Sequence, residues 1–593
     1  MKEISSVHIN RVNILISFFL GMSIFLFFNF YYPFHVQYQE LFQMFLYTSD
    51  YFIDRISHPG GLSDYLGNFF IQFYIYSWAG ALILSSLLVL LQIMFVWIAN
   101  RMNKNPACYP LSLLPAIAYW ILFCDENYML SGLISLLLNL FAVILSIKIS
   151  IRSIRLISCF VAIPILYFFS GGCFWVFVIF VILLEIYYWR ERMDSRWWMF
   201  VLTSFLLIVF SPLIAKCFYQ YPLERLWWGI GFYRFPTIPP YGQFFVCLLL
   251  ILIPVSTRFF PLLSSMKKYT LAIILQLFLI LITGTYLINT AANWDKEEVM
   301  GYIHSVQMQQ WDRILVMADE KNPTSPISVS CLNLALAKKS VLADKMFSYY
   351  QNGVEGLLPT FERDFTSPLS TGEIYYHLGM INTAQRFVFE AMEAIPDYQK
   401  SAYCFKRLAE TNIINGQYKV AGKYLKMLKQ TLFYRSWAME VLAFLNDEEK
   451  INKHPDWGEL KRMRFKQDFL FSANERDVML GLLFQNNKSN RMAFEYLIAY
   501  TLLDKNLEHF YRYYPLGRYL GYNHIPKSYQ EALLFMWCQN HNPLRERTPW
   551  SINPKIIERL QGYAQICIQQ KNSEPLLRND FGDTYWYYLH FRK

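Results

Sequence analysis

Charged residues are scarce in the first half of this 593-residue sequence. Residues 1–293 hold 17 Lys and Arg and 11 Asp and Glu, whereas the remaining residues hold 37 and 33. A half so poor in charge and so rich in long apolar runs excludes an ordinary soluble domain and indicates a membrane domain. The charged half is nearly balanced in sign, which gives no footprint for nucleic acid. We therefore predict two domains, residues 1–293 in the membrane and residues 294–593 in water.

Paired cysteine spacings are also absent. The ten cysteines are scattered, which excludes a disulfide or zinc framework, and we interpret them as small buried residues. Alternating apolar and polar residues are rare in residues 294–593, whereas apolar sets at i, i+3, i+4 and i+7 are frequent, so this half is predicted to be helical. No lysine follows the glycines of FFSGGCFW, Phe168 to Trp175, which favours a tight helical hairpin over a phosphate-binding loop.

Nine apolar runs are long enough, or nearly long enough, to cross a bilayer, which requires about 20 residues of helix. No small-residue cleavage site follows the first run, so we predict an uncleaved helix and not a signal peptide. The expected fold class is all-α: a polytopic membrane helix bundle of about nine spans, followed by a soluble helical domain. The runs occupy about residues 12–30, 69–99, 110–124, 129–147, 156–170, 174–189, 197–215, 243–257 and 269–290.

The positive charges of the membrane half are distributed unevenly among its loops. With the N-terminus inside, 13 Lys and Arg residues fall in inside segments and 4 in outside segments, as the positive-inside rule requires. Nine spans then place residues 294–593 outside. We therefore expect a multi-pass protein of the bacterial inner (cytoplasmic) membrane, with a periplasmic C-terminal domain.

The first outside loop, residues 31–68, is long and ordered in character. Within it, ELFQMFLYTSDYFIDRI places apolar residues at helical spacing and predicts an amphipathic helix along the membrane surface. The sequence SHPGG then forces a turn into the second span. Glu40 is the only charged side chain between Arg11 and Asp50, among several glutamines. Because partial desolvation disfavours a carboxylate, we expect Glu40 to face an outward polar cavity beside Asp125 and Glu126.

A loop of this kind, with an acidic residue, a surface helix and an HPGG…YLG turn, resembles the GT-C glycosyltransferases that use polyprenyl-phosphate sugars. In that superfamily a carboxylate after the first span, and often an acidic motif in the next outside loop, bind a metal or act on the acceptor. The resemblance implies catalytic roles for Glu40 and for Asp125 and Glu126 of CDENY. The first loop departs from the family pattern because Gln39 and Glu40 stand where two acids are usual.

A lipid-phosphate donor requires either a carboxylate that takes the acceptor proton or a divalent metal that holds the phosphate. It also requires cations, and the loop YQYPLERLWWGIGFYRFPTIPPYG supplies Arg225 and Arg234. Its Trp228 and Tyr233 suit sugar rings, although such residues also form the interfacial belt of membrane proteins. His58 of the HPGG turn completes the expected substrate-binding set.

The charged half contains a repeat. Gly379 and Ala384 recur 37 residues later as Gly416 and Ala421, in the order and spacing of a tetratricopeptide repeat. Such helix pairs stack into a solenoid, which predicts a binding surface for a protein partner. Together with NLALA and NRMAFEYLIAYTLL, these segments are also similar to a family of bacterial membrane proteins known only as a domain of unknown function. That resemblance spans most of the chain.

Two functions therefore remain open. One is a GT-C-like glycosyltransferase acting at the outer face, with the repeat domain presenting the acceptor. The alternative is a non-catalytic membrane-anchored scaffold that recruits partners in envelope assembly or polysaccharide export. The geometry that distinguishes them is whether the Glu40 carboxyl shares one cavity with Asp125 or Glu126.

Overall fold

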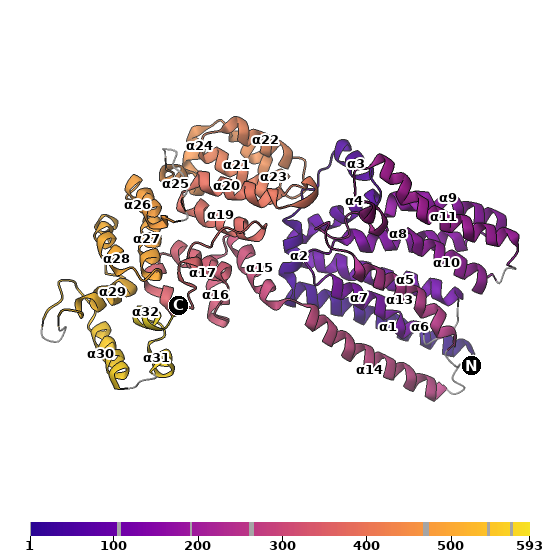
Figure 1. The fold of residues 1–593 in the computed structure, drawn as a ribbon, viewed down its shortest axis with the longest axis horizontal. Helices are drawn as coiled ribbons and strands as arrows, with labels where there is room; N and C mark the ends of the chain where they lie inside the picture. The colour runs from indigo at the N-terminus through magenta and orange to yellow at the C-terminus, as the bar shows by residue number, and fades with distance from the viewer. Residues whose placement is uncertain are drawn as a thin grey trace. The chain divides into compact units, whose positions relative to one another are not determined.

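The computed structural model describes residues 2–102, 108–189, 193–259, 266–465, 472, 474–541, 546–569 and 573–592. These residues form helices and no strand, which confirms the all-α prediction for the described part of the chain. The chain divides into two compact units, coloured from indigo to yellow along the sequence in Figure 1. Unit 1 is Met1–Glu297 with Gln430–Leu432, and unit 2 is Glu298–Lys429 with Phe433–Lys593.

All nine apolar runs are helical in unit 1. Seven helices are long and apolar enough to cross a membrane: α1 (Lys2–Leu26), α5 (Ser77–Met102), α8 (Leu130–Ile147), α9 (Arg152–Ser170), α11 (Ser195–Phe218), α13 (Tyr241–Ser256) and α14 (Met266–Ala291). The other two, α7 (Leu113–Leu122) and α10 (Phe174–Tyr187), are shorter. At 1.5 Å per residue, a helix of this length covers about 21 Å or less of a hydrocarbon core about 30 Å thick. The chain is therefore a membrane protein with seven full-length candidate spans.

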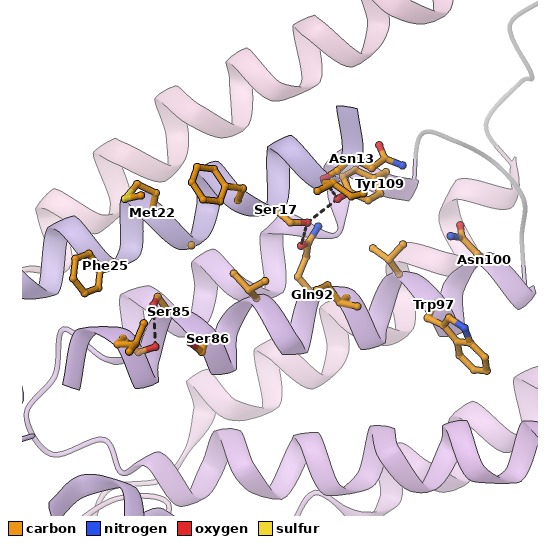
Figure 2. Close-up of a pocket in the computed structure, with 17 residues that line it drawn as sticks. Asn13, Ser17, Met22, Phe25, Ser85, Ser86, Gln92, Trp97, Asn100 and Tyr109 are labelled. Carbon is orange, nitrogen blue, oxygen red and sulfur yellow. Dashed lines mark hydrogen bonds between the residues drawn. The ribbon is translucent and has the colours of Figure 1, made fainter. Parts of the chain in front are cut away.

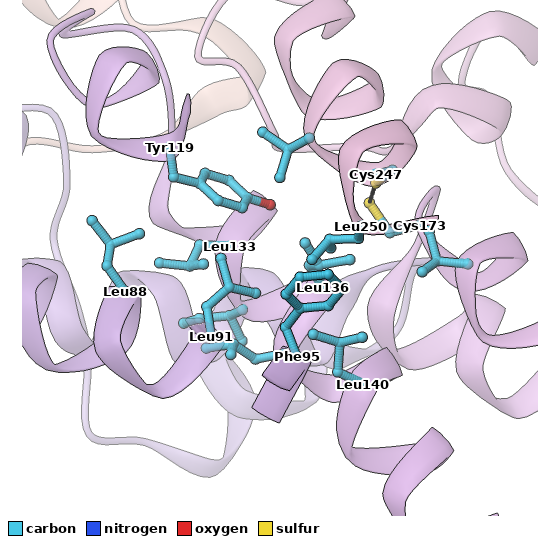
Figure 3. Packing of buried hydrophobic residues seen from close by; sticks show 14 of the residues in the cluster. Leu88, Leu91, Phe95, Tyr119, Leu133, Leu136, Leu140, Cys173, Cys247 and Leu250 are labelled. Atoms are coloured by element: carbon cyan, nitrogen blue, oxygen red, sulfur yellow. Dashed lines mark hydrogen bonds between the residues drawn. The ribbon is translucent and has the colours of Figure 1, made fainter. Parts of the chain in front are cut away.

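The core of unit 1 surrounds α8, which is buried on most of its surface. A helix that is apolar all round requires such a central position. Figure 3 shows side chains of α5, α7, α8 and α13 meeting in this core. Cys173 and Cys247 lie there as free thiols with their sulfur atoms 3.9 Å apart.

A polar network joins α1 and α5 inside the apolar bundle, beside a groove of about 890 Å³ (Figure 2). Ser17 Oγ donates to Gln92 Oε1 at 2.6 Å, and Gln92 Nε2 donates to Ser112 Oγ at 3.2 Å. Tyr109 of α6 (Cys108–Leu111) donates to the carbonyl of Asn13. Polar groups at membrane depth have no water to bind, so these mutual bonds fix the two helices against each other.

The predicted surface helix is only partly present. The structure has α2 (Pro33–Glu40), a non-helical stretch, and α3 (Ser49–Ile56), whose N-terminus is capped by Thr48 Oγ1 accepting from the N–H of Tyr51 at 3.3 Å. The expectation of one amphipathic helix is wrong because residues 41–45 are all buried. A segment covered on every side does not present the one apolar stripe that the spacing implied.

Three loops meet where α2, α3 and α4 (Gly61–Ile71) cover one end of the bundle. We call this end, with the 123–129 turn and the 219–240 loop around α12 (Leu223–Trp228), the α2 end. Gly60, Gly171 and Gly229 have φ of 82°, 76° and 109°. A Cβ on Gly171 would lie 3.2 Å from the Cα of Gly60 and 4.0 Å from that of Gly229. Glycine is therefore required at this point both by backbone conformation and by space.

Unit 2 contains five helix hairpins of one construction. In each, the helix ends at a residue with positive φ, and the following N–H bonds to the carbonyl five residues earlier, at 2.8–2.9 Å. This is the Schellman arrangement of helix C-termini. The turn residues are Gln309, Ser340, Gly379, Gly416 and Lys505. They join α15 (Trp294–Gln307) to α16 (Trp311–Glu320), α17 (Pro326–Lys338) to α18 (Leu342–Lys345), α19 (Thr366–Leu378) to α20 (Ile381–Glu393), α21 (Ala402–Ile414) to α22 (Tyr418–Leu428), and α27 (Arg491–Leu503) to α28 (Leu507–Tyr513).

Between and after these hairpins, unit 2 has further helices. They are α23 (Arg435–Phe444), α24 (Glu448–Lys453), α25 (Pro455–Met463), α26 (Arg476–Asn486), α29 (Lys527–Trp537), α30 (Pro554–Gln569), α31 (Glu574–Phe581) and α32 (Tyr585–Phe591). Ala384 and Ala421, the small residues of the sequence repeat, are fully buried on α20 and α22. Small side chains at these positions let the paired helices approach closely.

The turn residues allow a matched test. Gly379→Ala should lower the free energy of unfolding by about 1–2 kcal/mol because alanine is strained in the left-handed region. Its Cβ would also lie 3.2 Å from the Cβ of Met463, whereas Gly416→Ala meets nothing within 4 Å and should cost less. Ser340→Gly should not destabilise. Hydrogen exchange of the flanking helices measures the three effects, and equal losses at Gly379 and Gly416 would contradict the packing contribution.

Candidate functional site

The structure pairs two loops that the sequence could only describe separately. The N–H of Arg234 donates to the carbonyl of Asn127 at 2.8 Å, and the N–H of Met129 donates to that of Phe232 at 2.9 Å. An isolated antiparallel bridge joins Tyr128 and Tyr233. This pairing brings the acidic turn of residues 125–126 beside the second arginine of the 219–240 loop.

Arg234 is the most unusual cation at the α2 end. It is only 7% exposed, and its guanidinium carbon lies 3.2 Å from the centre of the Phe42 ring. Both terminal nitrogens are buried without a hydrogen-bond partner among the described residues. Burial lowers the pKa of Arg234 to about 10, while Tyr38, Glu126 and Asp125 act in the opposite direction. A buried, unsatisfied guanidinium is costly, and it is the group that best matches an oxyanion such as a phosphate.

The two acids of the turn have different environments. Asp125 Oδ1 accepts from the N–H of Asn127 at 2.9 Å, yet burial raises the pKa of Asp125 above its usual value. Burial acts in the same direction on Glu126, but Lys296 Nζ donates to Glu126 Oε1 at 2.7 Å, and the pKa of Glu126 is lowered overall. Glu126 therefore remains ionised at neutral pH and can accept a proton, whereas its raised pKa makes Asp125 the more basic of the two carboxylates.

Three residues that the sequence analysis did not select complete this cluster. His35 Nδ1 is 2.6 Å from Glu297 Oε2, and its Nε2 is 2.9 Å from the Tyr32 hydroxyl and 3.8 Å from Glu126 Oε2. The Glu297 carboxylate also accepts from the N–H groups of Phe34 and His35, at 2.8 and 3.0 Å. It therefore caps the N-terminus of α2 and orients the His35 ring. No sequence signal pairs residues 35 and 297, because they are separated by 262 positions.

Glu40 is the last residue of α2 and is 6% exposed. Its carboxyl makes no hydrogen bond or ion pair with any residue that the structure describes, and burial raises the pKa of Glu40 to about 8. Its amide neighbours anchor the segment: Gln39 Nε2 donates to the carbonyl of Tyr128 at 3.1 Å, and Gln43 Nε2 donates to that of Asn68 at 3.2 Å. At neutral pH Glu40 is therefore mostly protonated, and its chemistry is that of a proton donor.

This raised pKa predicts how Glu40→Gln changes stability. The ordinary pKa of a glutamate is 4.5, so Glu40 ionises at a lower pH in the unfolded chain than in the folded one. The free energy of unfolding therefore falls as the pH rises from about 4.5 to about 8. Glu40→Gln should remove this dependence, with a gain of at most about 3 kcal/mol at pH 7 and none at pH 4. Thermal unfolding across this pH range measures it. Asp50→Asn, an exposed acid of α3, should leave the profile unchanged, and a loss of stability at pH 8 in Glu40→Gln would refute the burial argument.

The remaining predicted residues have other neighbours. Arg225 lies 5.2 Å from the Tyr221 ring, and Trp228 lies 6.1 Å from the Tyr241 ring. Burial lowers the pKa of His58, while Asp64 raises it. Of the eight predicted residues, the structure thus brings together Asp125, Glu126, Tyr233 and Arg234. Burial raises the pKa of Tyr233, beside Asp125, to about 12.

A second polar group lies at the α2 end around Asp64. Arg55 Nη1 is 3.0 Å from Asp64 Oδ2, and Asn68 Nδ2 donates to Asp64 Oδ1 at 3.1 Å. This carboxylate is fully engaged by protein groups, so it stabilises the α3–α4 corner. The part of the chain that the structure describes holds no group of three His, Cys, Asp or Glu side chains suited to a metal ion. The described residues therefore offer no such set of ligands for a divalent metal that would hold the donor phosphate.

Comparison with known proteins gives one finding. No curated protein and no solved structure matches the chain. A family model described as a family of unknown function, DUF6057, matches residues 7–592. Since this match covers both units, the chain belongs to the DUF6057 family of unknown function.

Proposed function

We propose that this protein is a GT-C-like glycosyltransferase that takes a sugar from a polyprenyl-phosphate carrier at the outer face of a bacterial inner membrane. The observation that carries this proposal is the buried Arg234 guanidinium, whose terminal nitrogens have no hydrogen-bond partner in the described part of the chain. It lies beside two carboxyl groups of different proton affinity, Asp125 and Glu126. Such a pairing matches a donor phosphate on one side and an acceptor hydroxyl on the other.

The proposed step follows from these roles. The bond between the sugar C1 and the phosphate oxygen breaks, and a bond between C1 and the acceptor oxygen forms. Glu126, which Lys296 keeps ionised, takes the acceptor proton, while Arg234 stabilises the negative charge left on the carrier phosphate. In this proposal protonated Tyr233, beside Asp125, donates a hydrogen bond to the substrate, and protonated Glu40, Trp228, Arg225 and His58 are further substrate contacts.

The test of this function is chemical. Deletion of the gene should make a lipid-linked sugar accumulate in the membrane, because its consumption stops. Restoring the natural chain should remove the accumulated lipid. An unchanged profile of lipid-linked sugars in the deletion strain would overturn the enzyme proposal.

The orientation proposed here places the N-terminus and residues 2–12 inside and unit 2 in the periplasm. Support comes from the uneven loop charges, 13 inside against 4 outside when all nine apolar runs cross the membrane, α7 and α10 included. A reporter that is active only in the cytoplasm should be silent when fused after Lys593 and active when fused after Arg101. Activity at both positions would refute the orientation.

Unit 2 is proposed to be a tetratricopeptide-like α-solenoid. Five hairpins with the same left-handed turn support this assignment, because repeats of one supersecondary unit share their turn chemistry. A second candidate function, a scaffold that recruits a protein partner in envelope assembly or polysaccharide export, follows from such a surface. It is favoured by the Glu40 carboxyl, which has no polar partner among the described residues. If the protein is a scaffold, Arg234 has no chemical role, and Arg234→Met should keep full function.

A further inference from the structure

Unit 2 contains an aromatic pocket that the proposed function does not use. The cavity has a volume of about 790 Å³, within the usual range for small-molecule sites. It lies between α27, the 3₁₀ segment Tyr514–Leu520, the N-terminal part of α29 and residues 551–554, which lead into the start of α30. Figure 1 labels α27, α29 and α30 in the orange and yellow part of the chain.

The floor of the pocket is a group of four rings. Tyr529 is buried at its centre, with Phe494 and Tyr514 nearly perpendicular to it at 6.4 and 6.2 Å, and Tyr522 at 6.5 Å. Tyr514 and Tyr522 are only half-buried, so part of each remains available to a ligand. Edge-to-face packing of this kind holds the rings in fixed positions.

Two glycines give the pocket its shape. A Cβ on Gly517 would lie 2.6 Å from the Phe494 ring, so the absence of a side chain lets the backbone rest on that ring. Gly521 has φ of 62°, which turns the chain back along the opposite wall. Gln530 joins the walls, since its Nε2 donates to the carbonyl of Ile525 and its Oε1 accepts from the N–H of Asn553, both at 2.6 Å. The pocket is therefore preformed.

The polar residues of the pocket decide the class of ligand. No Asp or Glu is among the lining residues, and Arg491 already lies 4.9 Å from the Tyr522 ring, which disfavours a cationic ligand. Arg518 is the only lining Arg or Lys, which is too little positive charge for a polyphosphate. The remaining polar side chains are amides, a hydroxyl and an imidazole: Asn523, Gln530, Asn553, Ser551 and His524. A floor of aromatic rings surrounded by amide side chains matches a neutral ligand that has apolar faces and many hydroxyls.

We infer that this pocket binds a neutral oligosaccharide. A sugar ring places its C–H face on an aromatic ring and directs its hydroxyls outward, where Asn523, Asn553 and Arg518 can bond to them. The inference does not depend on catalysis, because a saccharide site in unit 2 would serve an enzyme that holds its acceptor and a scaffold that binds glycan alike. A proline-rich peptide is the competing occupant, since such peptides also pack on tyrosines.

The test uses the full-length chain in nanodiscs, because maltoside detergents would occupy a sugar site. The probes are linear neutral tetrasaccharides of glucose, mannose, galactose and N-acetylglucosamine, measured by saturation-transfer NMR and by titration. At least one should bind. Tyr514→Ala should raise its Kd by about tenfold, which corresponds to about 1.4 kcal/mol and is near the upper end of what one aromatic contact contributes. Tyr514→Phe should bind nearly as well as the natural chain, because it keeps the ring.

Tyr511→Ala is the matched control. Tyr511 lies three residues before Tyr514 and is 53% exposed, but it does not line the pocket. Its loss should leave the Kd unchanged. The inference is overturned if no tetrasaccharide binds, if Tyr514→Ala and Tyr511→Ala have equal effects, or if a polyproline peptide binds and is the ligand lost in Tyr514→Ala. The two proposals fail separately. If no saccharide binds but the deletion strain still accumulates lipid-linked sugar, the transferase proposal stands and the saccharide site is rejected.

Discussion

Arg234→Met should give a chain that folds at least as well as the natural one and yet lacks function. Methionine has a similar length and removes a buried charge whose terminal nitrogens find no hydrogen-bond partner among the residues described, so the change should not destabilise the α2 end. If Arg234 holds the donor phosphate, the loss of its charge-assisted bonds should reduce transfer by about 10²–10³-fold, the usual effect of removing one such donor. The measurement is clearance of the lipid-linked sugar in a complemented deletion strain.

A binding experiment separates this result from indirect effects. In nanodiscs, the natural chain should bind polyprenyl phosphate more tightly than the neutral polyprenol, and Arg234→Met should bind both lipids equally. Lys216→Met, which removes an exposed cation in the last turn of α11, is the matched control and should keep the preference. Full complementation by Arg234→Met would leave the guanidinium without a chemical role, and the scaffold would become the better account.

Arg407→Met should greatly lower the free energy of unfolding of unit 2. The Arg407 guanidinium bonds Glu373 through two nitrogens, at 2.9 and 2.6 Å, and bonds Glu410 at 2.6 Å. All three side chains are buried, and the Arg407 carbon lies 3.8 Å from the Tyr376 ring. Removal of the only cation leaves two buried carboxylates, at a cost of about 3–5 kcal/mol in the free energy of unfolding.

This effect should appear where the network lies. Glu373 belongs to α19 and Arg407 to α21, so hydrogen exchange should accelerate first in these two hairpins. The deficit should shrink in acid, because protonation neutralises the stranded carboxylates. Arg386→Met removes an exposed pair with Glu390, 3.6 Å long, and should change stability little. A similar loss in both variants would show that burial is not the reason.

The membrane helices were predictable because length and hydropathy decide them locally. The runs at 110–124 and 174–189 were predicted as spans, but their helices are short. Apolar residues can flank a helix without belonging to it. The run at 110–124, for example, contains α7, which ends at Leu122. The two domains were visible as a change in charge density, although charge alone does not indicate how helices pair.

The hairpin turns show a different limit. Gly379 and Gly416 were detected because their spacing matches a tetratricopeptide repeat, and the structure places both at left-handed turn positions, which favour glycine. Gln309, Ser340 and Lys505 adopt the same conformation with side chains that carry no such signal. The same backbone turn therefore recurs in unit 2 at more places than the sequence repeat reveals.

The candidate site was predictable in part. Asp125, Glu126, Tyr233 and Arg234 are polar residues between apolar runs, and that contrast identifies them. Their proximity depends on backbone bonds between residues 127–129 and 232–234, which no side-chain pattern records. Glu40 was expected to face a polar cavity with the two acids, and that expectation stays a prediction. Its amide neighbours prove to be anchors to backbone carbonyls.

The cap that Glu297 places on α2 has a consequence for synthesis. The chain emerges from the ribosome in order, so the N–H groups of Phe34 and His35 are made long before the carboxylate that accepts from them. Every long apolar helix of unit 1 precedes residue 297. The last of these helices, α14, ends at Ala291, only six residues before Glu297. The start of α2 therefore lacks its acceptor throughout the synthesis of the long apolar helices, and the α2 end can acquire its finished form only when α15 begins to emerge.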